Sequence, residues 1–121
     1  MPIVDIQIVA NSGSLPEDMA SKLANALGSA FGAAPGRVWV RLSVLASSSY
    51  AENEIDRDSS ALPTFVRVLH ADLPPTDSLT IEAKTVAKAV GNSLGRPSAL
   101  VHVEYAPPGR GCIAFGGNLL T

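Results

Sequence analysis

Met1-Pro2-Ile3-Val4-Asp5-Ile6-Gln7-Ile8-Val9 opens the chain and contains the pattern on which the rest is built. Apolar and polar side chains alternate along it, which predicts a β-strand from Ile3 to Val9 with one covered face. Asn11-Ser12-Gly13 follows and is typical of a turn after a strand. The first element of the chain is therefore expected to be a strand that begins directly behind Pro2.

A helix and a second strand are predicted next. Ser14-Leu15-Pro16-Glu17 has the pattern of a capping box, in which the serine accepts hydrogen bonds from first-turn amides and the glutamate reaches back. The helix is expected to run to about Phe31, where Gly32 ends it. Alternating apolar residues then predict a strand over Val38–Leu45, and the polar stretch Ser47–Ser60 is expected to be a loop.

The same order of elements then repeats. Pro63 opens a predicted strand that ends at His70, Gly95 ends a predicted helix, and Val101–Tyr105 forms a fourth predicted strand. The two copies align at a constant spacing: Leu27 with Val90, Phe31 with Leu94, Gly32 with Gly95, Val38 with Val101 and Val40 with Val103. We therefore predict an α+β fold in one domain, residues 1–121, made of duplicated β-α-β halves at about 2–60 and 63–121. Two such units give a four-stranded sheet with two helices on one face.

The other face of this predicted sheet has no covering layer. On the second and fourth strands it carries Trp39, Arg41, His102 and Glu104, a mixture too apolar and too extended for an ordinary solvent-facing surface. We expect another subunit to cover it. An ion pair between Arg41 and Glu104 across that interface would be a purely structural role for both residues.

Composition argues against several classes of function. A formal charge of −2 and a pI near 5.5 argue against a nucleic-acid or membrane-surface partner. Cys112 is the single cysteine, so an internal disulfide is excluded, and the two histidines have no metal-ligand spacing with it or with each other. No metal or other cofactor is therefore expected. The beginning of the chain lacks the pattern of a signal peptide, so a cytoplasmic location is expected.

Pro2 has two interpretations. If Met1 is removed, as a small second residue normally allows, the nitrogen of Pro2 becomes a secondary amine. Apolar surroundings or a neighbouring cation would lower the pKa of that amine, so that it could act as a neutral general base near pH 7. The alternative is that Pro2 only begins an edge strand, where its missing N–H costs nothing.

Four segments together resemble the tautomerase superfamily. They are the strand behind Pro2, Pro63–His70, Val101–Tyr105 and the ending Ile113–Gly117, which is similar to a C-terminal hairpin segment of the family. The similar branch is the longer one, around macrophage migration inhibitory factor and 5-carboxymethyl-2-hydroxymuconate isomerase, whereas a 4-oxalocrotonate tautomerase corresponds to one half of the chain. The resemblance implies a homotrimer, in which three sheets form a barrel with the helices outside and the active sites lie between subunits.

The resemblance also implies roles for individual residues. Pro2 matches the catalytic proline. His102 falls where the inhibitory factor has a tyrosine contributed by the neighbouring subunit, so an imidazole would replace a phenol as proton donor. An intersubunit pair of His102 and Glu104 without a catalytic role is the alternative. The other implied substrate-binding residues are Glu104 in place of an asparagine, Phe115 in place of a tryptophan, Ile113 in place of a valine, and His70, Ala71 and Asp72 along the pocket wall.

The main departure from the family is Ala33, which stands where the inhibitory factor has a lysine that binds the substrate carboxylate. Arg37 matches an aromatic residue at the pocket edge and would supply the missing cation, with a guanidinium that binds a carboxylate through two hydrogen bonds. For His70, a strand-end histidine without a ligand is the preferred interpretation. Arg67 has two interpretations, since it either faces the pocket or pairs with an acidic neighbour, and the alternation along its strand does not decide between them.

Three function classes remain open. The first, which we prefer, is an isomerase: neutral Pro2 takes a proton from the carbon beside the carbonyl of a small 2-oxo acid and returns it elsewhere, while a cation holds the carboxylate. The second uses the same amine for water addition, dehalogenation or decarboxylation, with Glu104, Asp72 or Glu52 to activate water. The third is a trimeric binding protein without turnover. The fold alone does not choose among them.

Overall fold

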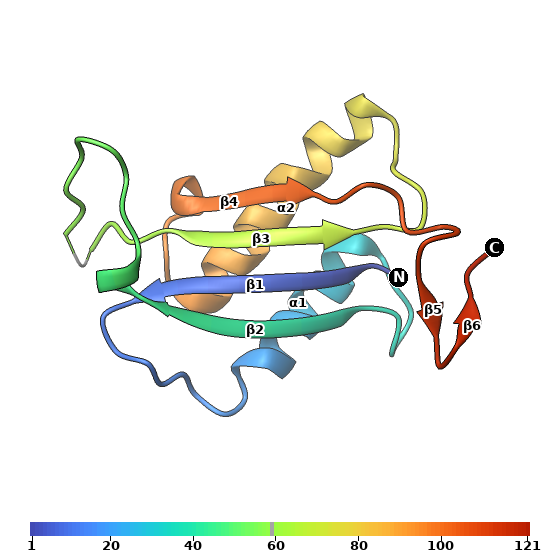
Figure 1. Ribbon diagram of the computed structural model, residues 1–121, viewed down its shortest axis with the longest axis horizontal. Helices are drawn as coiled ribbons and strands as arrows, with labels where there is room; N and C mark the ends of the chain where they lie inside the picture. The colour runs from blue at the N-terminus through green and yellow to red at the C-terminus, as the bar shows by residue number, and fades with distance from the viewer. Residues whose placement is uncertain (59) are drawn as a thin grey trace.

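A computed structural model describes residues 1–58 and 60–121; Ser59, which belongs to the predicted polar stretch and to the predicted first half, lies outside them. A four-stranded mixed sheet forms one layer and two helices form the other (Figure 1). In chain order the elements are β1 (Ile3–Ala10), α1 (Met19–Phe31), β2 (Trp39–Ala46), the 3-10 turn Ser47–Ser49, β3 (Thr64–Leu69), α2 (Thr76–Leu94), the 3-10 turn Ser98–Leu100, β4 (Val101–Tyr105), β5 (Ala114–Phe115) and β6 (Asn118–Leu119).

The strands of the large sheet lie in the order β2-β1-β3-β4. β1 and β2 are parallel, β3 and β4 are parallel, and the two pairs are joined by the antiparallel neighbours β1 and β3. Each parallel pair is connected through one helix, and both helices lie behind the sheet in Figure 1. The predicted α+β fold with duplicated β-α-β units is therefore confirmed. Strand boundaries shift by one residue, since β2 begins at Trp39 instead of Val38 and β3 ends at Leu69 instead of His70.

The core lies between the sheet and the helices. Every second side chain of β1 from Val4 to Ile8 is at most 1% exposed, because successive side chains of a strand point to opposite faces. The helix residues in the same cluster are Leu23, Leu27, Val86 and Val90, all fully buried. The same alternation leaves the polar side chains of β1 on the face opposite the helices, which we call the open face.

The first helix begins later than the sequence predicted, and the prediction of a capping box at Ser14–Glu17 is wrong. α1 begins at Met19, and Asp18 at its N-cap position makes no side-chain capping hydrogen bond. The cause is Pro16, because a residue that precedes proline is disfavoured from the helical conformation. The carbonyl of Pro16 instead accepts a hydrogen bond of 3.1 Å from the amide of Met19, in a turn that leads into the helix.

The predicted helix ends are confirmed. Gly32 and Gly95 follow α1 and α2 with φ of 62° and 70°, the left-handed conformation that lets the chain leave a helix. At the end of the chain β5 and β6 form a small hairpin, which lies beside the amino terminus at one end of the sheet in Figure 1. Within the described part of the chain, neither helix combines the length and the apolar character needed to cross a membrane.

Candidate active site

A cavity opens at the end of the sheet where β1 begins. Pro2 is buried next to Met1 and is not itself among the residues that line the cavity; its carbonyl oxygen accepts a hydrogen bond of 3.2 Å from the backbone amide of Trp39. This bond extends the pairing of β1 with β2, in which Ile3 lies opposite Trp39. The cavity has a volume of about 370 Å³ and is lined by Met1, Arg37, Trp39, Ala71, Phe115 and Leu120. It therefore combines the amino terminus, the start of β2, the segment after β3 and the β5–β6 hairpin.

The amino group at this cavity is shifted toward its neutral form. It is carried here by Met1, and its pKa is lowered from the usual value, first by burial and then by the positive charge of Arg37. Both causes disfavour the protonated form. A tight turn places Arg37: its backbone amide donates to the carbonyl of Ala34 at 3.1 Å, and Gly36 adopts a φ of 77°, which favours glycine.

Two aromatic rings form one wall of the cavity. Trp39 and Phe115 stack with their ring centroids 5.0 Å apart and an interplanar angle of 24°. Phe115 was predicted at the pocket mouth and does line this cavity, whereas Trp39 was predicted only on the open face and Leu120 was missed. The position of Trp39 in the cavity could have been inferred from the sequence, because Trp39 begins the strand that pairs with the strand behind Pro2. Trp39 is 39% exposed in a single chain.

The other predicted pocket residues have different environments. Ala71 lines the cavity, whereas His70, Asp72 and Ile113 do not. Nε2 of His70 lies 2.8 Å from a carboxylate oxygen of Glu82, so its side chain has a partner within the protein. The carboxylate of Asp72 accepts a hydrogen bond of 2.9 Å from Nε of Arg110. The substrate-binding roles of His70, Asp72 and Ile113 stay predictions.

His102 and Pro2 lie toward opposite ends of the sheet. In the register His102 is opposite Phe65, and Phe65 is opposite Gln7. The separation of Gln7 from Pro2 along β1 corresponds to about 17 Å at a strand rise of roughly 3.4 Å per residue. Within one chain His102 therefore cannot reach the cavity at Pro2. It could contribute only to the cavity of another copy, as the resemblance implies.

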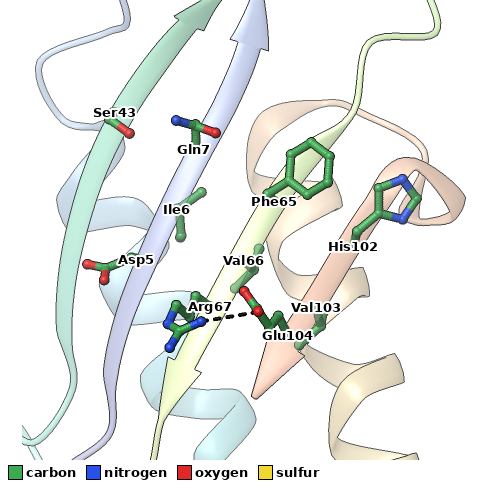
Figure 2. Close-up of a pocket in the computed structure, with 10 residues that line it drawn as sticks. All are labelled: Asp5, Ile6, Gln7, Ser43, Phe65, Val66, Arg67, His102, Val103 and Glu104. Atoms are coloured by element: carbon green, nitrogen blue, oxygen red, sulfur yellow. Dashed lines mark ion pairs between the residues drawn. The ribbon is translucent and has the colours of Figure 1, made fainter. Parts of the chain in front are cut away.

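A second, larger cavity lies on the open face around His102. Its volume is about 650 Å³, and Figure 2 shows the side chains of Phe65, Arg67, His102 and Glu104 along it. The ring centroids of Phe65 and His102 are 5.4 Å apart. Glu104 forms an ion pair of 3.1 Å with Arg67, drawn as a dashed line in Figure 2. The structure thus places Arg67 on the open face and gives Glu104 a partner within its own chain.

A row of alternating charges crosses the open face. The register places Arg41 opposite Asp5, Asp5 opposite Arg67, and Arg67 opposite Glu104. Arg41 donates two hydrogen bonds to the carboxylate of Asp5, at 2.6 and 2.9 Å. Each charge in the row therefore has a neighbour of opposite sign. Such a row tolerates burial against another sheet better than isolated charges would.

Solved structures resemble this chain, although no family model and no curated protein matches its sequence. A fused 4-OT that forms a symmetric trimer is 16% identical, with a TM-score of 0.74 over 98% of this chain and 94% of that chain. Macrophage migration inhibitory factor from Trichinella spiralis is 11% identical, with a TM-score of 0.72 over 97% and 98%. FG41 malonate semialdehyde decarboxylase, inhibited by 3-bromopropiolate, is 10% identical, with a TM-score of 0.69 over 94% and 88%. At these identities the likeness is one of fold.

Proposed function

We propose that this chain, whose fold is that of the tautomerase superfamily, is a tautomerase that uses the amine of Pro2 as its general base. With Met1 removed, the amine takes a proton from the carbon beside the carbonyl of a small 2-oxo acid and returns it to another atom of the same molecule. The observation that carries the proposal is the cavity at the start of β1, where burial and Arg37 both act on the terminal amino group.

The base in this proposal is a neutral secondary amine. Pro2 lies one residue farther into the protein than Met1 and is buried. Burial disfavours an ammonium ion, and the charge of Arg37 disfavours it further. The pKa of the Met1 amino group is lowered by these two causes, and we expect them to act in the same direction on the Pro2 amine once Met1 is removed. A lowered pKa increases the fraction of the amine that is unprotonated, and so able to accept a proton, at neutral pH.

Arg37 and the aromatic wall define the class of substrate. A guanidinium can hold a carboxylate through two parallel hydrogen bonds. The stacked rings of Trp39 and Phe115 provide an apolar surface on which a planar or aromatic substituent can pack. We therefore expect a 2-oxo acid with an aromatic or extended planar substituent, for which phenylpyruvate is a suitable probe.

Other arginines are less suited to bind the carboxylate. Arg110 forms an ion pair with Asp72, Arg41 with Asp5, and Arg67 with Glu104. Arg41 and Arg67 also lie on the open face and do not line the cavity at Pro2. Arg37 does line it. Ala33 stands where the family pattern has a carboxylate-binding lysine, and Arg37 would supply the missing positive charge.

Water addition, dehalogenation and decarboxylation form the alternative, since a decarboxylase has the same fold. Activation of water would need a carboxylate with an accessible lone pair. Hydrogen bonds from Arg57 and then Tyr50 lower the pKa of Glu52, and a hydrogen bond from Arg110 lowers the pKa of Asp72. Carboxylates with lowered pKa are weaker bases. Glu104, the third candidate, forms an ion pair with Arg67. The partners of these three carboxylates favour proton transfer by Pro2 over activation of water.

The test combines a mass and a rate. The mass of the natively expressed protein is measured first, to establish that Met1 is absent. The conversion of enolised phenylpyruvate to its keto form is then followed by absorbance, with the uncatalysed rate subtracted. Acceleration by the processed protein supports a tautomerase. Binding of phenylpyruvate without acceleration would instead support the trimeric binding protein.

We also propose a homotrimer, and light scattering at micromolar concentration is expected to give the mass of three chains. The open face carries Trp39 and Phe65, which are 39% and 38% exposed in a single chain, beside the row of paired charges. A monomer would leave this apolar and charged surface in water. A monomeric mass at this concentration would contradict both the trimer and a site between subunits.

Mixed trimers of Pro2→Ala and His102→Gln chains are expected to recover activity that neither parent has. Because His102 lies far from Pro2 of its own chain, mixing places an intact Pro2 beside an intact His102 in some of the sites. The two chains are refolded together and the conversion of enolised phenylpyruvate is measured. Mixing either variant with a chain that carries both substitutions is the control and restores nothing. Activity no greater than the mean of the two parent variants would mean that His102 has no catalytic role at the site of a neighbouring subunit.

A further inference from the structure

A cluster of three polar side chains lies between α2 and the ends of β3 and β4, apart from the cavity. One carboxylate oxygen of Glu82 lies 2.8 Å from Nε2 of His70 and accepts a hydrogen bond of 2.7 Å from the hydroxyl of Tyr105. The side chains of His70 and Glu82 are only 13% and 18% exposed. A carboxylate with so little access to water needs protein partners, and the cluster supplies two of them.

The rings of the cluster fix the position of His70. The His70 ring stacks on Tyr105, with centroids 5.9 Å apart and an interplanar angle of 13°, and it meets Phe31 edge-on at 5.6 Å. Phe31 is the last residue of α1, so His70 contacts side chains from both helices and from β4. Burial, and then the hydrogen bond with Glu82, raise the pKa of Tyr105. The phenol therefore stays protonated and remains a donor.

The backbone at His70 supports the wall of the cavity. The carbonyl of His70 accepts a hydrogen bond of 2.8 Å from the amide of Gly109, and the carbonyl of Ala71 accepts one of 3.0 Å from the amide of Arg110. A Cβ on Gly109 would lie 2.9 Å from the terminal methyl of Met1 and 3.3 Å from the His70 carbonyl oxygen, so the two segments pack closely. His70 and Ala71 are thus held by the side-chain cluster and by the segment at 109–110, and Ala71 lines the cavity.

We propose that His70, Glu82 and Tyr105 form a positioning unit that fixes the Ala71 wall and so determines how tightly an acid is held against Arg37 and Pro2. None of the three side chains lines the cavity, so they act through Ala71. The chain of contacts is short and continuous, from packed rings to a shared carboxylate to two backbone hydrogen bonds. The part of the inference that concerns the acid rests on the function proposed above, whereas the part that concerns the wall does not.

Hydrogen exchange tests the wall directly. In Tyr105→Phe and Glu82→Gln, the amides of Gly109 and Arg110 are expected to exchange about tenfold faster, because their acceptors lose a fixed position. Tyr105→Phe keeps the ring, so the fold is preserved. Amides in the centre of β1 report global opening and are expected to be unchanged. Glu17→Gln, the same substitution at an exposed glutamate before α1, is the matched control and is expected to have no effect. Unchanged exchange at 109 and 110 in both variants would overturn the inference, whatever the protein catalyses.

Fluorescence of Trp39 tests the effect on the acid. Trp39 is the only tryptophan of the chain and lines the cavity, so its emission reports binding of phenylpyruvate without turnover. The Kd for phenylpyruvate is expected to rise about three- to tenfold in Tyr105→Phe and Glu82→Gln, and KM to change more than kcat. A merely structural role would lower Tm and leave Kd unchanged.

The outcomes separate this inference from the proposed function. Weaker binding in the variants of a protein without turnover would uphold the positioning unit and overturn the tautomerase. Turnover by all forms with equal Kd would uphold the tautomerase and overturn the effect on the acid. If phenylpyruvate does not bind the unsubstituted protein at all, the effect on the acid is likewise overturned, and hydrogen exchange alone decides the positioning of Ala71.

Discussion

Turnover of enolised phenylpyruvate is expected to fall at least about a hundredfold when Met1 stays on the chain. In such a chain the nitrogen of Pro2 is an amide, which does not accept a proton at neutral pH. The fold does not depend on the change, because β1 begins at Ile3. The rates of processed and Met1-retaining protein are compared after mass spectrometry has established each amino terminus and light scattering has shown the same assembly.

Pro2→Ala separates the loss of the base from blockage of the cavity. Met1 itself lines the cavity, so its retention could exclude substrate as well as remove the amine. The processed Pro2→Ala chain has no Met1 in the cavity, and its primary amine is less basic and free to rotate. We expect a loss of at least about a hundredfold here too, with binding of phenylpyruvate, followed by Trp39 fluorescence, retained. Equal turnover by all three forms would leave Pro2 as the start of a strand and assign the chemistry to another group.

Much of the fold could be predicted because its signals are local. Alternation from Ile3 to Val9 defines β1, and Gly32 and Gly95 end the helices in the left-handed conformation that glycine adopts readily. The repetition of the β-α-β order then leaves few arrangements of the four strands. The local rule that failed was the capping box at Ser14, where the effect of Pro16 on its preceding residue outweighed the cap.

The candidate site was less predictable because it depends on register and on packing between distant segments. The ion pair between Arg67 and Glu104 depends on the register of β3 against β4. The alternation of apolar and polar residues within each strand does not determine that register. The stacking of Trp39 on Phe115 joins β2 to the terminal hairpin, and no spacing in the sequence reports that contact. The contact of His70 with Glu82 likewise depends on where α2 packs against the end of β3.

Arg37→Ala is expected to raise KM for phenylpyruvate about ten- to a hundredfold, because a charge-assisted hydrogen bond to the carboxylate is lost. Arg37→Lys is the matched control. It keeps the positive charge and loses the bidentate hydrogen bonds, so its KM is expected to lie between that of the unsubstituted protein and that of Arg37→Ala. Arg41→Ala removes an arginine of the open face that is paired with Asp5 and does not line the cavity. If Arg41→Ala raises KM and Arg37→Ala does not, the carboxylate of phenylpyruvate is bound at the open face and not by Arg37.

The same substitution has a second signature in the pH dependence, which follows from the charge of Arg37. The neutral amine is the active form, so kcat/KM rises with pH through the pKa of the amine and is lost as pH falls below it. Burial, the larger cause, and Arg37 both lower the pKa of the terminal amino group. Removing the arginine removes one of these causes, so the pKa rises and the acidic limb of the profile moves to higher pH, while Arg37→Lys leaves it nearly in place. A raised KM with an unmoved limb would mean that Arg37 binds the carboxylate without acting on the base.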